Sequence, residues 1–277
     1  MTTDDWTRDE LLAALEWQLS FGADEATGEN PVDSYTLTLE LAEKATQPKA
    51  AQEQAPTNKV LTAKPSQAKK ALQSLQKTLA EANNLATGAN TLSELKAALQ
   101  NFDGCSLKKT AISTVFNEGT ETSKLMIIMG TPRADEDREG KTVAGLNRIL
   151  LNNMLKSIGL DIEQVYLTSC VFWRPPGDKK PTANDLAYCK PFVDRQISLT
   201  KPKVLMLLGE TTLRSFTDPD ASLLRQRGKW SDYNTPEGAI STKMISTFAP
   251  HMLLNTPRQK ALAWQDLRAV KQQLSQI

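Results

Sequence analysis

The chain has 277 residues, of which 40% are hydrophobic and 23% charged, with one histidine and three cysteines. This length allows one sizeable domain with an appendage, and the apolar content suffices for a globular core. No apolar run reaches the roughly 18 residues of a membrane span, and the acidic start does not fit a signal peptide. Three scattered cysteines without a C-x-x-C pair exclude a disulfide framework and argue against a zinc site. We therefore expect a cytoplasmic protein, with no membrane contact and no cofactor.

The net charge of +1 averages two unlike parts of the chain. Residues 1–100 carry 9 basic and 14 acidic side chains, whereas residues 101–277 carry 24 and 18. A basic main part fits a protein that meets a polyanion such as DNA. An ordinary solvated surface explains the same excess, so charge alone leaves both interpretations open.

The N-terminal part contains helix patterns and one polar stretch. Residues 4–22 have apolar side chains at helical spacing, and so do residues 68–84 and 91–102, the last with a capping box from Thr91 to Glu94. The stretch between the first two helices is rich in Ala, Gln, Lys and Pro, which predicts a linker. The expected organisation is an N-terminal helical segment (1–42), a flexible linker (43–67), a helical extension (68–101) and a main domain (102–277).

The main domain alternates short apolar runs with helix patterns. The apolar runs are "KLMIIMG" (124–130), "QVYLTSCVF" (164–172), "KVLMLLG" (203–209) and "KMISTFA" (243–249). The helix patterns cover residues 145–159, 183–200 and 210–216. Continuous apolar runs are typical of strands buried on both faces of a parallel sheet. We therefore predict an α/β fold, a three-layer α/β/α sandwich with a central four-stranded, mostly parallel sheet. Ligands of such sheets bind beyond the carboxyl ends of the strands.

The segments that follow these strands resemble a uracil-DNA glycosylase of the family-4 type, over residues 100–272. "EDREGKTVAGLNRILLNNMLKSIGL" is similar to the family's E-D-x-x-G-x-P-F-V-G stretch and the helix after it. "WRPPGDKKPT" resembles its R-P-P-G-N-R-x-P-T motif, in the bacterial branch with a tryptophan before R-P-P. "LRQRGKW" and "TFAPHMLLNTP" match L-R-G-x-W and T-x-H-P-A-x-L-L-R-x-P. The resemblance implies the family fold and a role on DNA in base-excision repair.

The same resemblance shows that the family's site residues are replaced. The family uses a carboxylate, a stacking Phe, a base-reading Asn and a His that stabilises charge on the leaving base. The matching positions here are Gly130, Val143, Ser169 and Ala249. We therefore expect weak or lost uracil excision.

The resemblance also bears on the family's iron–sulfur cluster. Its four cysteine positions hold Phe102, Cys105, Trp173 and Cys189, which leaves two thiolates instead of four. We infer that the chain carries no such cluster.

Three side chains are candidates for residual chemistry. His251, the sole histidine, lies two residues past the family's His position, one pleat further along an extended segment. Glu136 and Asp137 match the family's E-D pair, and either carboxylate is able to position a water. The alternatives are a loop or DNA contact for His251 and a structural cap for the two carboxylates.

Basic side chains and a proline on the same loops are candidates for DNA contact. They are Arg174, Lys179, Lys180, Arg225, Arg227, Lys229 and Pro250, with His251. Two other hypotheses stay open: an active glycosylase with altered base specificity, and an interaction module that docks a repair or replication partner through its N-terminal helices. We expect a monomer that binds single- or double-stranded DNA.

Overall fold

The computed structural model describes residues 65–236, 238 and 240–276. The predicted helix at 4–22 and most of the predicted linker lie outside this part. The described residues belong to one compact unit, Ala63–Ile277. None of its helices is both long and apolar enough to cross a lipid bilayer.

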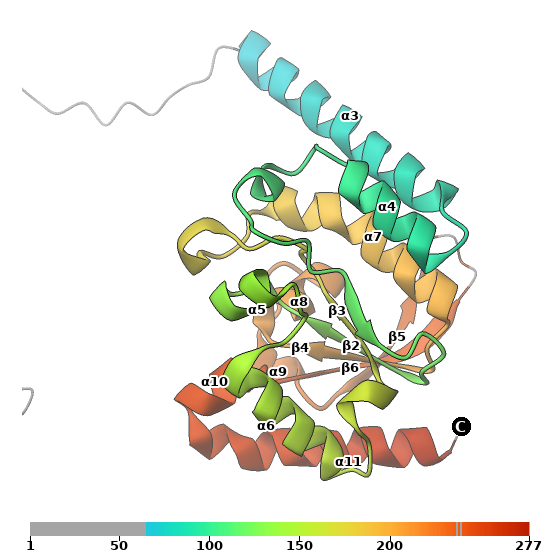
Figure 1. Ribbon diagram of the computed structural model, residues 1–277, viewed down its shortest axis with the longest axis vertical. Helices are drawn as coiled ribbons and strands as arrows, with labels where there is room; N and C mark the ends of the chain where they lie inside the picture. Colours follow the sequence, from blue (N-terminus) through green and yellow to red (C-terminus); the bar gives the residue numbers. More distant parts are fainter. Residues whose placement is uncertain (1–64, 237, 239, 277) are drawn as a thin grey trace, which may run out of the picture. The chain divides into compact units, whose positions relative to one another are not determined.

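A six-stranded mixed sheet forms the centre of this unit (Figure 1). Its order is β1-β3-β2-β4-β6-β5, and the four inner strands run parallel. The strands are β1 (Asn117–Gly119), β2 (Leu125–Met129), β3 (Tyr166–Ser169), β4 (Val204–Leu208), β5 (Trp230–Asn234) and β6 (Ser241–Thr247). The four predicted strands are thus confirmed as the parallel centre. The sheet also has an antiparallel strand at each edge, β1 and β5, which the prediction lacked.

Helices cover both faces of the sheet, so the predicted three-layer α/β/α architecture is confirmed (Figure 1). Helices α7 (Ala183–Thr200), α4 (Leu92–Asn101) and α3 (Pro65–Gly88) lie over one face, and α6 (Gly145–Lys156) and α11 (Lys260–Ser275) over the other. Shorter helices follow strand ends: α5 (Ala134–Glu139), α8 (Glu210–Phe216), α9 (Leu223–Gln226) and α10 (Pro250–Asn255). The 3₁₀ turns are η2 (Ser106–Lys109), η3 (Ile162–Gln164), η4 (Pro176–Asp178) and η5 (Pro257–Gln259).

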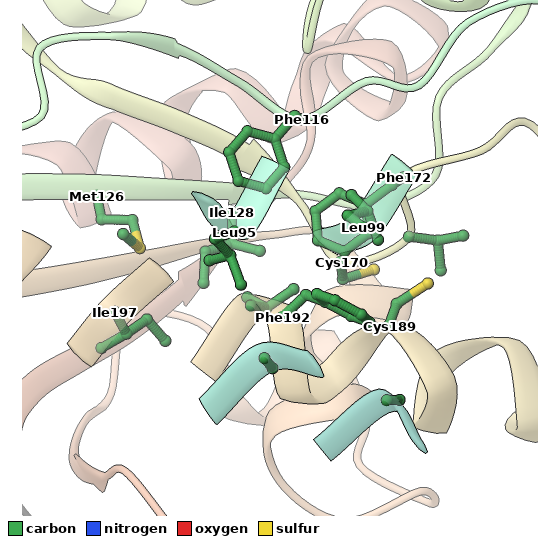
Figure 2. Packing of buried hydrophobic residues seen from close by; sticks show 14 of the residues in the cluster. Leu95, Leu99, Phe116, Met126, Ile128, Cys170, Phe172, Cys189, Phe192 and Ile197 are labelled. Carbon is green, nitrogen blue, oxygen red and sulfur yellow. The ribbon is translucent and has the colours of Figure 1, made fainter. Parts of the chain in front are cut away.

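The inner strands are apolar because each has a hydrophobic core on both sides. Successive side chains of a strand point to opposite faces. In β2, Met126 and Ile128 join the core under α7, while Leu125, Ile127 and Met129 join the core under α6 and α11. Figure 2 shows the first core, in which β2, α4 and α7 side chains meet. This two-sided burial is the reason that the strands read as continuous apolar runs.

The helical extension is part of the same fold. Thr91 caps α4 by accepting a hydrogen bond from the backbone N–H of Glu94, as predicted. Leu95 and Leu99 of α4 are fully buried in the first core (Figure 2). Helix α3 packs on α7, and the Arg195 side chain of α7 donates to the Ala89 carbonyl that follows α3. Helices α3 and α4 therefore contribute core side chains to the main domain.

Candidate functional site

A cavity of about 310 Å³ lies at the carboxyl ends of the parallel strands. This is the edge at which sheets of this kind bind ligands. Its walls come from the ends of β2, β4 and β6, from the loop after β3, and from the helices α5, α6, α8 and α10. The lining residues are Met129, Gly130, Thr131, Arg133, Glu136, Thr142, Asn147, Asp178, Lys179, Lys180, Pro181, Leu208, Gly209, Glu210, Thr211, Ala249, Pro250, His251 and Met252.

Gly209 allows two strand ends to approach each other beside this cavity. Its φ of +92° is a backbone conformation that glycine adopts readily, and its N–H donates to the Thr247 carbonyl on β6. A Cβ atom at this position would lie 3.3 Å from the Ala249 Cβ. The glycine therefore joins the β4 and β6 ends and leaves room for the cavity.

The four positions that the resemblance assigns to the family's site residues offer the cavity no polar side chain. Gly130 and Ala249 line it, but neither carries a donor or acceptor beyond its backbone. Val143 is fully buried in the core under α6. Ser169 is also fully buried at the end of β3, and its hydroxyl has no hydrogen-bond partner among the described residues.

The two candidate carboxylates occupy different environments. Glu136 lines the cavity, and its carboxylate accepts hydrogen bonds from the backbone N–H groups of Arg133 and Ala144 at 3.1 and 3.2 Å. Asp137 does not line it, because its carboxylate accepts from the backbone N–H groups of Ile112 and Ser113. Both carboxylates therefore hold loops in place, and only Glu136 also meets the cavity.

His251 lies in a helix, which corrects the expectation of an extended segment. Pro250 begins α10 at the first helical position, where its fixed φ and missing N–H are tolerated. His251 lines the cavity and is partly buried. Burial disfavours its charged form and the Arg133 guanidinium repels it, which together lower the pKa of His251 to about 4. The imidazole is therefore neutral at physiological pH.

The candidate DNA-contact residues also divide into two groups. Lys179 and Lys180 line the cavity and are exposed, and the described residues provide no ion pair for either. Arg225 and Lys229 are exposed and likewise without a described ion pair. These four side chains are available to phosphate groups.

The remaining candidates have partners or are buried. Arg174 forms an ion pair of 2.7 Å with Asp178. Arg227 donates to both carboxylate oxygens of Asp266, at 3.0 and 2.5 Å. Pro250 is buried at the cavity wall. Arg227 is thus engaged within the fold, which the sequence did not indicate.

Several polar residues of the cavity were not among the sequence-based candidates, and three of them are Arg133, Asn147 and Thr142. Arg133 lies in the loop that follows β2, at the sheet edge where ligands of such folds bind, and its position after a predicted strand was the available signal. Asn147 lies on α6, with its amide nitrogen 3.5 Å from the Glu136 carboxylate. Thr142 donates from both its backbone N–H and its hydroxyl to Glu118 of β1. Nothing in the sequence pattern marked the last two.

Comparison with known proteins identifies the family of this chain. A sequence profile described as the Uracil DNA glycosylase superfamily matches residues 116–268, more than half of the chain. The chain belongs to the uracil DNA glycosylase superfamily. This match includes all four inner strands and every wall of the cavity.

Proteins named Type-4 uracil-DNA glycosylase are similar to this chain. One from Sulfurisphaera tokodaii is 27% identical over 188 residues, which cover 66% of this chain and 84% of that protein. One from Thermotoga maritima is 31% identical over 151 residues, 54% of this chain and 76% of that protein. One from Archaeoglobus fulgidus is 30% identical over 158 residues, 56% and 78% respectively. The resemblance to family-4 glycosylases is therefore confirmed.

The positions that correspond to the cluster ligands of family-4 glycosylases do not fit an iron–sulfur cluster. Cys105 and Cys189 are buried, the Cys105 thiol donates to the Asp185 carboxylate at 3.6 Å, and burial raises the pKa of Cys189 well above its usual value. Phe102 and Trp173 are buried with them, and the Trp173 indole donates to the Thr114 hydroxyl. Two thiols and two aromatic rings do not provide the four thiolates of such clusters. The absence of a cluster stays a prediction.

Proposed function

We propose that this member of the superfamily binds DNA at the carboxyl edge of its sheet and excises uracil weakly or not at all. The observation that carries this proposal is the chemistry of the cavity wall. The positions of the family's carboxylate and histidine present only backbone and a methyl group, and those of its ring and amide are buried.

The expected loss of rate is large. Removing one donor to the developing oxyanion costs about 10²–10³ in rate, roughly 3–4 kcal/mol. Loss of the carboxylate, the ring and the amide adds to this, although such effects are not additive. A serine hydroxyl does not reproduce the paired hydrogen bonds of an amide, and that of Ser169 is buried.

DNA binding is supported by the four exposed basic side chains near this edge. Lys179 and Lys180 belong to the loop after β3, and Arg225 and Lys229 flank the turn before β5. Phosphate contacts of this kind release counterions, so binding weakens as salt rises. Their unpaired state favours phosphate contact over a network of ion pairs within the protein.

Binding and excision are tested on one sample. Labelled single- and double-stranded oligonucleotides, with and without uracil, are titrated at fixed salt and then treated with hot alkali, which cleaves at abasic sites. We expect salt-dependent binding and no uracil-specific cleavage. Rapid cleavage at catalytic protein concentrations would overturn the lost-activity part of the proposal. Absence of binding at low salt would overturn the DNA-binding part.

A second candidate function is an active glycosylase with altered specificity. One observation favours it: Glu136 and His251 line the same cavity, and the His251 imidazole is neutral. On this hypothesis Glu136 positions the water and His251 donates to the leaving base, while Asp137 acts only through the loop. If Glu136→Gln and His251→Ala both left an observed activity intact, this hypothesis would be wrong.

A third candidate is a protein partner bound through the N-terminal helices. Helices α3 and α4 bury one face against α7, which favours a structural role for them. The predicted helix at 4–22 lies outside the described residues. Removal of residues 1–89 deletes α3 and is expected to lower the melting temperature, whereas removal of residues 1–64 keeps α3 and tests the N-terminal segment by itself. A loss of DNA affinity in the shorter deletion would favour a functional role for the N-terminal segment.

A further inference from the structure

The carboxylates of the cavity all have partners within the protein. Glu136 accepts two backbone N–H groups. Asp178 is paired with Arg174, and Glu210 accepts from Arg214 at 3.0 Å. An ion pair offsets the charge of Asp178 and of Glu210, whereas Glu136 keeps its negative charge because its partners are backbone N–H groups. Of the three acidic residues of the wall, only Glu136 is therefore left to balance its cations.

The cations of the cavity have no such partners. Arg133, Lys179 and Lys180 line it from two different loops, and each is exposed. The described residues offer none of the three side chains an ion pair or a hydrogen bond. The cavity thus has three positive charges that face the single carboxylate of Glu136, on loops that follow neighbouring strands of the sheet.

The positions assigned to the family's site residues give a neutral base little to bind in this cavity. Gly130 and Ala249 add no polar side chain, and the amide of Asn147 is directed to Glu136. The imidazole of His251 is uncharged, so it is able to donate one hydrogen bond without bringing a fourth charge. The wall is therefore better matched to an anionic oxygen cluster than to the edge of uracil.

We propose that this cavity binds a phosphate monoester, with Arg133, Lys179 and Lys180 as its ligands. This inference rests on the proposed DNA-binding edge for its location, but it needs no base excision. A monoester has a charge of about −1.5 to −2 at neutral pH, whereas a phosphodiester within a strand has −1. Three unpaired cations match the monoester better. The planar guanidinium of Arg133 is suited to paired hydrogen bonds with two phosphate oxygens. The phosphorylated end of a DNA strand and a free mononucleotide share this chemistry.

The sole histidine of the chain provides a local probe. Because His251 lines the cavity, its ring protons give one set of NMR resonances that report on occupancy. The full chain is titrated with inorganic phosphate, with thymidine and with thymidine 5′-monophosphate, and then with one oligonucleotide bearing either a 5′-phosphate or a 5′-hydroxyl. We expect the phosphate-bearing ligands to shift the His251 resonances and the hydroxyl forms to leave them in place. Equal affinity for the two oligonucleotides, with the nucleotide bound, would assign the site to free nucleotides.

Two substitutions test the ligands, with one matched control. Arg133→Gln and Lys180→Gln should each weaken binding of the phosphate group about tenfold, the step expected for one hydrogen bond to a charged group. Arg268→Gln removes an exposed charge of α11 that is not part of the cavity, and it should change nothing. Unchanged affinity in both cavity variants would overturn the proposal, as would a His251 shift that is the same for hydroxyl and phosphate forms.

The outcomes also separate this inference from the proposed function. Fluorescence anisotropy of the 5′-hydroxyl oligonucleotide measures binding at the sheet edge without a terminal phosphate. If that oligonucleotide binds and the His251 resonances do not respond to any phosphate, only the present inference fails. If it does not bind while phosphate shifts His251, the DNA-binding function fails and the phosphate site stands.

Discussion

Arg227 is expected to stabilise the folded state through its contacts with Asp266. Its replacement by methionine tests this expectation. Its guanidinium donates to both oxygens of Asp266 and to the Leu262 carbonyl, and it lies 5.7 Å from the centre of the Phe248 ring. Side-chain exposure is 14% for Arg227 and 3% for Asp266, so the pair is shielded from water. The Asp266 carboxylate also accepts from the Thr247 hydroxyl at the end of β6.

The size of the expected stability loss follows from the Asp266 charge that remains in the variant. Arg227→Met keeps most of the apolar stem but leaves the Asp266 carboxylate buried without its cation. Breaking a buried ion pair on one side costs about 3–5 kcal/mol. For a domain of this size each kcal/mol lowers the melting temperature by about 2–4 °C, so the expected decrease is roughly 6–20 °C.

The titration of Asp266 determines how stability changes with pH. Burial raises the pKa of Asp266 above its usual 3.8, even with Arg227 beside it. The folded protein therefore holds this proton more tightly than the unfolded chain, and stability falls as pH rises from about 3.8 through the folded pKa. Without Arg227 the pKa rises further, so the deficit of the variant should widen between pH 4 and pH 7.

Calorimetry at pH 4 and pH 7 tests this role of Arg227. The four proteins compared are the unchanged chain, Arg225→Met, Arg227→Met, and Arg227→Met combined with Asp266→Asn. Arg225→Met, an exposed neighbour without a described partner, should melt with the unchanged protein. Arg227→Met with Asp266→Asn removes both charges and keeps an oxygen for the Thr247 hydroxyl, so most of the stability should return. A melting temperature of Arg227→Met within about 2 °C of the unchanged protein would refute the reasoning, since it falls below the shift for one kcal/mol.

Three further outcomes are expected. Trp173→Ala should lower stability by about 3–5 kcal/mol in chemical denaturation, because the indole is 1% exposed; a loss under 1 kcal/mol would mean that the ring is not packed. NMR titration of His251 should give a pKa of about 4, and stability should be lost as pH falls from 6.5 toward that value. Arg133→Gln should raise the pKa of His251, because it removes a repulsive positive charge. An unshifted His251 pKa in this variant would contradict the stated cause. Replacing Lys179 and Lys180 together by Gln should reduce the slope of log affinity against log salt on duplex DNA by about 1.8; an unchanged slope would exclude both from phosphate contact.

The inner sheet was predictable from the sequence, and its edges were not. Apolar runs such as residues 203–209 identify strands that are buried on both faces. The edge strand β5 has polar and exposed side chains at Ser231, Asp232 and Asn234, and β1 is only three residues long. Edge strands of this kind have no continuous apolar pattern, because one of their edges faces solvent. They are strands only through backbone pairing with a neighbouring strand, which the sequence does not reveal.

The site was predictable in position and less so in detail. The carboxyl ends of parallel strands placed Glu136 and His251 in one region, and both line the cavity. The partners of Asp137 and Arg227 lie 24–25 and 39 residues away along the chain, so their structural roles needed the folded arrangement. The helix at His251 was missed because α10 has only six residues and begins with a proline.

The buried hydroxyl of Ser169 affects which substitutions the folded chain tolerates. A polar group without a partner in the interior lowers stability by about 1–3 kcal/mol relative to a satisfied or apolar one. Alanine at this position would remove that cost and leave only a small void. The end of β3 is therefore a point where the fold gains from substitution, while the neighbouring strand residues, packed on both faces, resist it. The position that the resemblance assigns to base reading is thus one at which a small apolar side chain should make the protein more stable.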